Sequence, residues 1–356
     1  MAGTMSTKKR VKRMYAHQEA DRVPVIDQPW GATLERWHKE GMPHDVEYID
    51  YFGLDKFETI FIDNSPQFPQ EVIEETEDYV IRTSRWGATL KEWKHRGGVP
   101  EFLEYRISDP DSWQDAKERM KPDPGRIDWD DLDQKYKNWR DEGAWISAGF
   151  WFGFDVTHAR AVGTERLLTS MIDNPEWVKD MFSHFLKMNL KLYQMVWDKG
   201  YHFDEVSWPD DLGYKGAQFF SLKTYRELLK PFHKKAADWA HEKGIKVKLH
   251  SCGDVNPFVP EFIDLGIDML NPLEVKAGMN PIELKEKYGD KLCFQGGINA
   301  LLYEKPEKLW SEMKKIIPQM KKQGGYIVSS DHSVPENFSR KQFEKFVSLA
   351  HELGSY

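Results

Sequence analysis

Eight short apolar or β-branched runs alternate with longer amphipathic stretches, and this alternation constrains the fold more than any other feature of the chain. Such a rhythm is typical of a parallel sheet built from βα units. The expected strands are Val23–Asp27, Phe57–Ile62, Ala144–Gly149, Phe203–Trp208, Ile245–His250, Asp268–Asn271, Lys291–Gly296 and Tyr326–Ser330. Because eight units in 356 residues fit one closed barrel, we expect an α/β fold of the (β/α)8, or TIM barrel, class.

The helical stretches between these runs begin and end at recognisable residues. Ser221 precedes an expected helix over Leu222–Lys243, Pro306 opens another that ends before Gly324, and Ser339 caps a third over Arg340–Leu353. Neither a G-x-G-x-x-G turn nor a G-x-x-x-x-G-K-[ST] loop occurs in the sequence. The sequence therefore gives no support to nucleotide binding by either fingerprint.

One stretch, residues 63–143, departs from this alternation. It contains a predicted hairpin (Glu71–Thr76, Tyr79–Ser84 and Trp86–Lys91) and an acidic segment with prolines, Lys121–Asp133. No clean linker lies on either side of it. We therefore expect a single domain over residues 1–356, with residues 63–143 inserted over the barrel mouth between the second and third strands.

Composition excludes several classes of function. Lys and Arg number 50 against 58 Asp and Glu, so the net charge of -8 offers no broad basic face to a nucleic acid. No stretch approaches about 18 uninterrupted apolar residues, so we expect no membrane span. The basic segment Lys8–Arg13 has no apolar run behind it, unlike a secretory signal, and two cysteines cannot make a disulfide framework. We expect a cytoplasmic protein.

In a TIM barrel the functional residues gather where the carboxyl ends of the strands meet. The side chains predicted at these ends are Asp27, Trp30, Trp151, Trp208, Asp210, Asp211, His250, Cys252, Asn271, Gln295, Asp331 and His332. Asp27, Asn271 and Gln295 are predicted to contact substrate. Trp30, Trp151 and Trp208 would together make an apolar cup for a ring, although each alone is typical of a core or rim residue.

His250-x-Cys252 is the sharpest signal for a metal. Imidazole and thiolate suit zinc, and two donors at i and i+2 on an extended strand end point to the same side. His332, at the end of the last strand, would supply the third ligand of a catalytic zinc with one open position. The alternative is a small buried Cys252 and two histidines bonded to loop carbonyls. Cys293 lies roughly 13 Å below the end of its strand, so we expect it in the core.

The adjacent acids Asp210 and Asp211 allow three roles. They could act as a general acid or base, as a further metal ligand, or as the acceptor for a substrate hydroxyl. Adjacent acids before Gly213 are equally typical of a solvated helix start, and the residues leave this choice open.

The segment Lys248-Leu-His-Ser-Cys-Gly-Asp254 resembles the H-S-C-G signature of the uroporphyrinogen decarboxylase superfamily. Other features of that family follow in order, at Arg22-Val-Pro-Val, Ala159-Arg-Ala-Val-Gly-Thr-Glu165, Asp210-Asp-Leu-Gly, Asp268-Met-Leu-Asn-Pro272, Gln295-Gly-Gly-Ile and Gly324–Pro335. The resemblance covers nearly the whole chain and implies a (β/α)8 barrel. The family contains a cofactor-free decarboxylase and zinc methyltransferases that work with corrinoid proteins. H-x-C belongs to the methyltransferase branch, where a later Cys completes the zinc site; here that position is His332.

This resemblance implies zinc held by His250, Cys252 and His332, and a cobalamin presented by a partner corrinoid protein. With two imidazoles and one thiolate the site keeps a net positive charge, which favours an oxygen leaving group over a thiolate nucleophile. We therefore expect the first component of an O-demethylase: aryl methyl ether and Co(I) corrinoid give phenolate and methyl-Co(III). Asp210 or Asp211 would bind a neighbouring hydroxyl or act as acid, and Asp331 would orient a ligand.

Three alternatives remain. A thiol-methylating enzyme would run the transfer from methylcobalamin to a thiol. A decarboxylase would need paired arginines for a tetrapyrrole's carboxylates, and the segment from Asp27 to Arg36 has no such pair. A non-catalytic ligand-binding subunit would bind an ether without transferring methyl. The sequence leaves the oligomeric state open, with a homodimer as one outcome.

Overall fold

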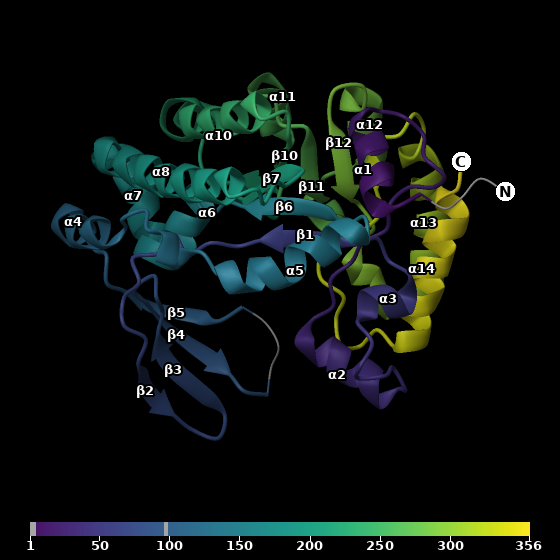
Figure 1. The fold of residues 1–356 in the computed structure, drawn as a ribbon, viewed down its shortest axis with the longest axis horizontal. Helices are drawn as coiled ribbons and strands as arrows, with labels where there is room; N and C mark the ends of the chain where they lie inside the picture. Colours follow the sequence, from purple (N-terminus) through teal and green to yellow (C-terminus); the bar gives the residue numbers. More distant parts are fainter. Residues whose placement is uncertain (1–4, 96–98) are drawn as a thin grey trace.

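The computed structural model describes residues 5–95 and 99–356, and seven of the eight predicted strands pair there in parallel and in chain order. These strands are β1 (Phe57–Ile60), β6 (Trp145–Gly149), β7 (Glu205–Pro209), β10 (Lys246–His250), β11 (Met269–Leu273), β12 (Cys293–Gly296) and β13 (Tyr326–Ile327). A parallel sheet in strict chain order curls because each crossover has the same hand. Figure 1 shows the curved sheet with α8 (Pro175–Asp198) and α10 (Lys230–Glu242) packed on its outside.

The first predicted strand is reduced to single bridges. Val25 pairs in parallel with Val328, just beyond β13, and the Val25 carbonyl accepts a hydrogen bond from the Asp55 amide, two residues before β1. Residues 23–27 therefore lie between the last strand and the first and occupy the eighth position. The TIM-barrel class predicted from the sequence is confirmed.

Helices connect the strands. The remaining helices of the barrel are α1 (Thr7–Tyr15), α2 (Gly31–Lys39), α3 (Tyr48–Phe52), α5 (Trp129–Asp141), α6 (Phe154–Val156), α7 (Thr164–Asp173), α9 (Leu222–Thr224), α11 (Val259–Leu265), α12 (Pro281–Tyr288), α13 (Pro306–Met320) and α14 (Arg340–Gly354). Ser221 and Ser339 cap their helices through their hydroxyl groups, as predicted. The helix predicted over 222–243 passes through a π-helical turn, Tyr225–Leu229, because Pro231 lacks the amide hydrogen that the regular pattern needs.

The inserted stretch forms a four-stranded antiparallel sheet and helix α4 (Pro110–Arg119). Its strands are β2 (Val72–Glu75), β3 (Tyr79–Thr83), β4 (Ala88–Trp93) and β5 (Glu101–Tyr105), so the three-stranded hairpin prediction missed β5. Figure 1 shows this sheet standing off one side of the barrel. The Tyr105 hydroxyl donates to the carbonyl of Ala159, which follows β6. That the insertion covers the mouth stays a prediction.

The barrel interior is polar at its centre. The Glu205 carboxylate lies fully buried and pairs with the Lys248 ammonium at 2.9 Å, while Ser147 and Trp145 donate to it as well. Lys248 lies two residues before His250 on β10, so both side chains point toward the barrel axis. Within residues 5–95 and 99–356, no helix combines the length and apolar character that crossing a membrane requires.

Candidate functional site

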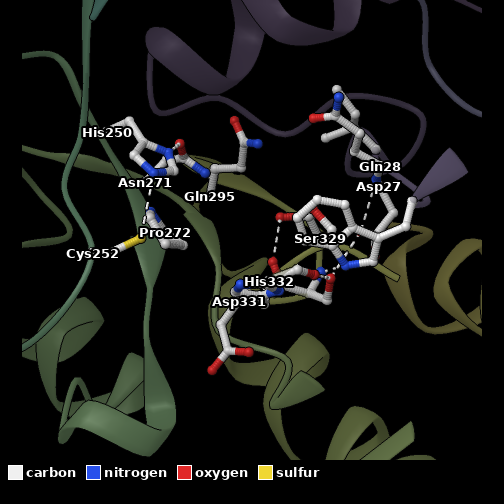
Figure 2. Close-up of a pocket in the computed structure, with 14 residues that line it drawn as sticks. Asp27, Gln28, His250, Cys252, Asn271, Pro272, Gln295, Ser329, Asp331 and His332 are labelled. Atoms are coloured by element: carbon white, nitrogen blue, oxygen red, sulfur yellow. Dashed lines mark hydrogen bonds between the residues drawn. The ribbon is translucent and has the colours of Figure 1, made fainter. Parts of the chain in front are cut away.

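A cavity of about 330 Å³ opens where the strands end, and it collects most of the side chains predicted for the site. It is lined by Ile26, Asp27, Gln28, Trp30, His250, Cys252, Asn271, Pro272, Gln295, Ser329, Ser330, Asp331, His332 and Ser333. Figure 2 shows His250, Cys252 and Asn271 on one side and Asp27, Gln28 and His332 on the other, with Gln295 between them. Most of the side chains predicted at these strand ends therefore line one open cavity.

Two glycines bring the loop after β7 against the loop after β10. A Cβ on Gly253, whose φ is +83°, would lie 2.0 Å from the backbone of Gly213, and a Cβ on Gly213 would lie 2.7 Å from the backbone of Asp254. Only glycine fits such a close backbone approach. The Ser251 hydroxyl then accepts a hydrogen bond from the Leu212 amide at 3.0 Å. This packing carries Asp211 to the side of Cys252.

Asp211, His250 and Cys252 place one ligand atom each within 4.8 Å of one another. The His250 Nε2 atom lies 3.4 Å from the Cys252 Sγ atom and 3.7 Å from the Asp211 Oδ1 atom. On its other edge, His250 Nδ1 donates to the Asn271 amide oxygen at 2.8 Å, because an amide oxygen can only accept. Nδ1 thus carries the proton, and the lone pair of Nε2 faces the cluster.

The pKa values of Cys252 and Asp211 are shifted in the direction that a bound cation would reverse. Burial, followed by the nearby carboxylates of Asp211 and Glu274, raises the pKa of the Cys252 thiol well above its usual range. Burial also raises the pKa of Asp211, although His250 opposes that rise. The Cys252 thiol therefore holds a proton that a bound metal would displace. Glu274 also accepts a hydrogen bond from the Gly253 amide and so holds the loop that carries Cys252.

The carboxylates on the opposite side are already engaged. The buried Asp27 accepts hydrogen bonds from the Ser330 amide and hydroxyl, from the Gln28 amide and from the Tyr303 hydroxyl. Burial nevertheless raises the pKa of Asp27 to about 6. Asp331 accepts from the amides of Val275 and Ala300 at 2.9 and 2.8 Å, so it joins the loops that follow β11 and β12.

Several predicted residues lie apart from the cluster. His332 is exposed across the cavity, with its ring 5.9 Å from that of Trp30, and the structure does not bring it to His250 and Cys252. His332 as a metal ligand therefore stays a prediction. Trp208 is fully buried against Phe152 and His233, at ring distances of 5.4 and 5.5 Å, and does not line the cavity.

Trp151, Asp210 and Asp211 also lie outside the lining of this cavity, although Asp211 contacts Cys252 at its wall. Trp151 stacks under the guanidinium of Arg160, whose carbon is 4.6 Å from the ring centre. Asp210 is fully buried and accepts from His233 Nε2 and from the Asp155 amide, both at 2.7 Å. The aromatic cup predicted from three tryptophans is represented at this cavity by Trp30 alone.

Comparison with known protein families adds one decisive match. The profile of the family described as uroporphyrinogen decarboxylase (URO-D) matches residues 154–353, more than half of the chain. The chain belongs to the URO-D family. The matched residues 154–353 include Asp211, His250 and Cys252.

Solved structures extend the likeness of this URO-D family member to the whole chain. A methyltransferase from Methanosarcina mazei superposes with a TM-score of 0.66 at 15% identity, covering 98% of this chain and 99% of that one. At this identity the likeness shows a shared fold. Dispersin B matches with a TM-score of 0.32 at 7% identity, over 64% of this chain and 76% of that one, which carries no argument. A comparison with curated protein sequences gave no match.

Sequence reasoning assigned no role to three residues that build this site. Tyr303 and Ser330 hold Asp27, and Glu274 holds the Cys252 loop. The signal available for Glu274 was its position just after β11, whereas Tyr303 comes from a helical turn distant in sequence from Asp27. Asp211 was predicted as an acid or base with metal ligation as one alternative, and the glycines Gly213 and Gly253 were the sign that its loop meets the Cys252 loop.

Proposed function

We propose that this URO-D family protein is a zinc-dependent methyltransferase that moves a methyl group from a methyl ether to the corrinoid of a partner protein. The observation that carries the proposal is the cluster of Asp211, His250 and Cys252, of which His250 and Cys252 line the cavity at the strand ends. The fold shared with a methyltransferase from Methanosarcina mazei supports it.

The donor set fits zinc. One imidazole nitrogen, one sulfur and one carboxylate oxygen are the ligand types that Zn²⁺ takes, and three protein ligands leave one position for a substrate. Bound there, zinc would supply a Lewis acid for the ether oxygen, and the partner's Co(I) corrinoid would supply the nucleophile for the methyl carbon. His250, Cys252 and Asp211 would hold the metal.

The other residues position these groups and the substrate. Asn271 fixes the ring of His250 by accepting from its Nδ1–H, and Glu274 fixes the Cys252 loop. Trp30 and His332, whose ring centres are 5.9 Å apart, offer flat surfaces to an aromatic ring. None of the described residues that line the cavity is Lys or Arg, which disfavours a tetrapyrrole with many carboxylates and hence the decarboxylase reaction.

Methyl transfer to a thiol is the second candidate, and one observation favours it. The sequence-based argument for an ether assumed His332 as third ligand and a net positive site. If Asp211 is the third ligand, the thiolate and the carboxylate balance the charge of Zn²⁺, and that argument no longer selects an oxygen leaving group. The ether proposal then rests on the aromatic wall of the cavity.

One assay tests both directions. Zinc-loaded protein is mixed either with a methoxylated benzene and Co(I) cobalamin or with methylcobalamin and 2-mercaptoethanol, and the cobalamin absorbance is followed. We expect methylcobalamin to form in the first mixture. Consumption of methylcobalamin in the second mixture alone would establish the thiol direction, and no transfer in either mixture by the metal-loaded protein would contradict the proposed function.

A further inference from the structure

Gln295, on β12, carries a hydrogen-bonding atom in the cavity that no described residue satisfies. Its Oε1 atom is buried and has no hydrogen-bond partner among the described residues. A buried amide oxygen without a donor is costly, so such an atom in a ligand cavity points to a donor that arrives with the ligand.

The neighbouring polar groups in the cavity differ from Gln295 in this respect. Asn271, the corresponding amide on β11, accepts from His250, while Asp27 and Asp331 accept from backbone amides. Other buried side-chain atoms without partners in the described part of the chain belong to residues that do not line this cavity. Gln295 is therefore the buried acceptor that this cavity leaves for a ligand.

Its position suits recognition of a group beside the reacting ether. Gln295 lies on the strand between β11, which carries Asn271, and β13, which leads to His332. Figure 2 shows its amide between the His250 side of the cavity and the Gln28 side. A ring lying along Trp30, with its ether oxygen toward the metal donors, would pass this amide.

We infer that Gln295 accepts a hydrogen bond from a hydroxyl group of the substrate, so that the methyl ether is a methoxyphenol. This inference rests on the proposed function. It gives Gln295 the hydroxyl-binding role that the sequence offered to Asp210 or Asp211, because Asp210 is buried behind the cavity and Asp211 lies in the metal cluster.

The test compares ligands with and without the hydroxyl. Calorimetry on the zinc-loaded protein measures the dissociation constants of methoxybenzene and of 2-, 3- and 4-methoxyphenol. We expect at least one methoxyphenol to bind about 10- to 100-fold more tightly than methoxybenzene, as one buried hydrogen bond allows. Gln295→Met, which keeps the size of the side chain and removes the acceptor, should bring that preference to about onefold. Gln295→Glu keeps an acceptor and should retain it.

The outcomes separate the inference from the proposed function. Equal binding of all four ligands by the wild type, with methyl transfer from methoxybenzene intact, would overturn the inference and leave the function standing. A hydroxyl preference that survives in Gln295→Met, with zinc content and melting temperature unchanged, would also overturn it. Failure of all four ligands to bind the zinc-loaded wild type would overturn both.

Discussion

The two sides of the cavity carry similar residue types but use them differently. On one side, Asp211, His250 and Cys252 turn their ligand atoms toward one another; the outer atom of His250 is bonded to Asn271, and Asp211 Oδ1 accepts from the Cys252 amide at 2.8 Å. On the other side, Asp27 accepts from Ser330, Gln28 and Tyr303 and joins the first and last segments of the barrel.

The difference shows how to distinguish a reactive carboxylate from a structural one at a barrel mouth. Both Asp27 and Asp211 have a raised pKa, and burial is the largest cause for each. What separates them is their partners: both oxygens of Asp27 accept hydrogen bonds, whereas Asp211 accepts on Oδ1 from the Cys252 amide and lies beside the ligand atoms of His250 and Cys252. On this basis we expect substitutions on the Asp211 side to remove the metal and substitutions on the Asp27 side to destabilise the fold.

The largest effect is expected on the metal side. Cys252→Ala removes the sulfur ligand and should abolish both bound zinc and methyl transfer, because two remaining donors do not make a stable zinc site. Elemental analysis and the cobalamin assay measure the two losses. The matched control is Cys293→Ala, since Cys293 is buried in the barrel with its thiol bonded to the Met14 carbonyl, and it should keep zinc. Zinc and turnover retained in Cys252→Ala would remove the metal proposal.

On the structural side, Asp27→Ala should lower the free energy of unfolding by about 3 kcal/mol near pH 4, because it leaves buried amide and hydroxyl donors without an acceptor. Folding raises the pKa of Asp27 from 3.8 to about 6, so its protonated form contributes stability that is present below pH 4 and is lost as the pH rises through 6. The deficit of the variant should therefore shrink toward neutral pH. Denaturant unfolding from pH 4 to 7 measures this, and a deficit that grows with pH would contradict it.

A smaller effect is expected at Asn271, behind the metal side. Asn271→Leu leaves His250 Nδ1 without its acceptor, so the ring is no longer held with Nε2 toward the cluster, and zinc affinity should fall about 10- to 100-fold. Competition with a coloured chelator measures this change. Asn271→Asp keeps an acceptor and should stay near the wild type; equal losses in both variants would show that Asn271 acts through packing instead.

The smallest effect is expected on ligand affinity, and it should differ between Trp30 and Trp208, which the sequence grouped together. Trp30→Leu should weaken methoxybenzene binding by about 2- to 12-fold, the range of one aromatic contact, since Trp30 lines the cavity. Trp208→Phe should leave that affinity unchanged, because Trp208 packs on Phe152 outside the cavity. The same calorimetry serves both variants. A larger loss in Trp208→Phe would restore the three-tryptophan cup.

The sequence predicted the strands and their ends well because both follow from local patterns. Period-two alternation placed His250 and Cys252 on one side, and their 3.4 Å contact confirms it. The same alternation, applied to β7, places Trp208 on the opposite face of the sheet from Glu205. The sequence therefore already indicated that Trp208 packs on the outer face of the sheet. The contact of Asp211 with Cys252 could not be predicted from such a local pattern, because it depends on two loops whose close approach requires glycine.

Strand β5 escaped prediction for a related reason. Glu101–Tyr105 is mostly exposed, and its glutamates interrupt the apolar alternation, so its pairing with β4 supplies what its own pattern lacks. Asp27 presents the same difficulty at the site: its partners Tyr303 and Ser330 lie at the far end of the chain and meet it only when the barrel closes.

The zinc content of the wild type, Asp211→Asn and His332→Ala tests the central claim most directly. The account predicts about one zinc per chain in the wild type and in His332→Ala, and loss of most of it on dialysis of Asp211→Asn, because Asp211 and not His332 lies with His250 and Cys252. Zinc lost in His332→Ala and kept in Asp211→Asn would contradict that claim and restore the ligand set predicted from the sequence.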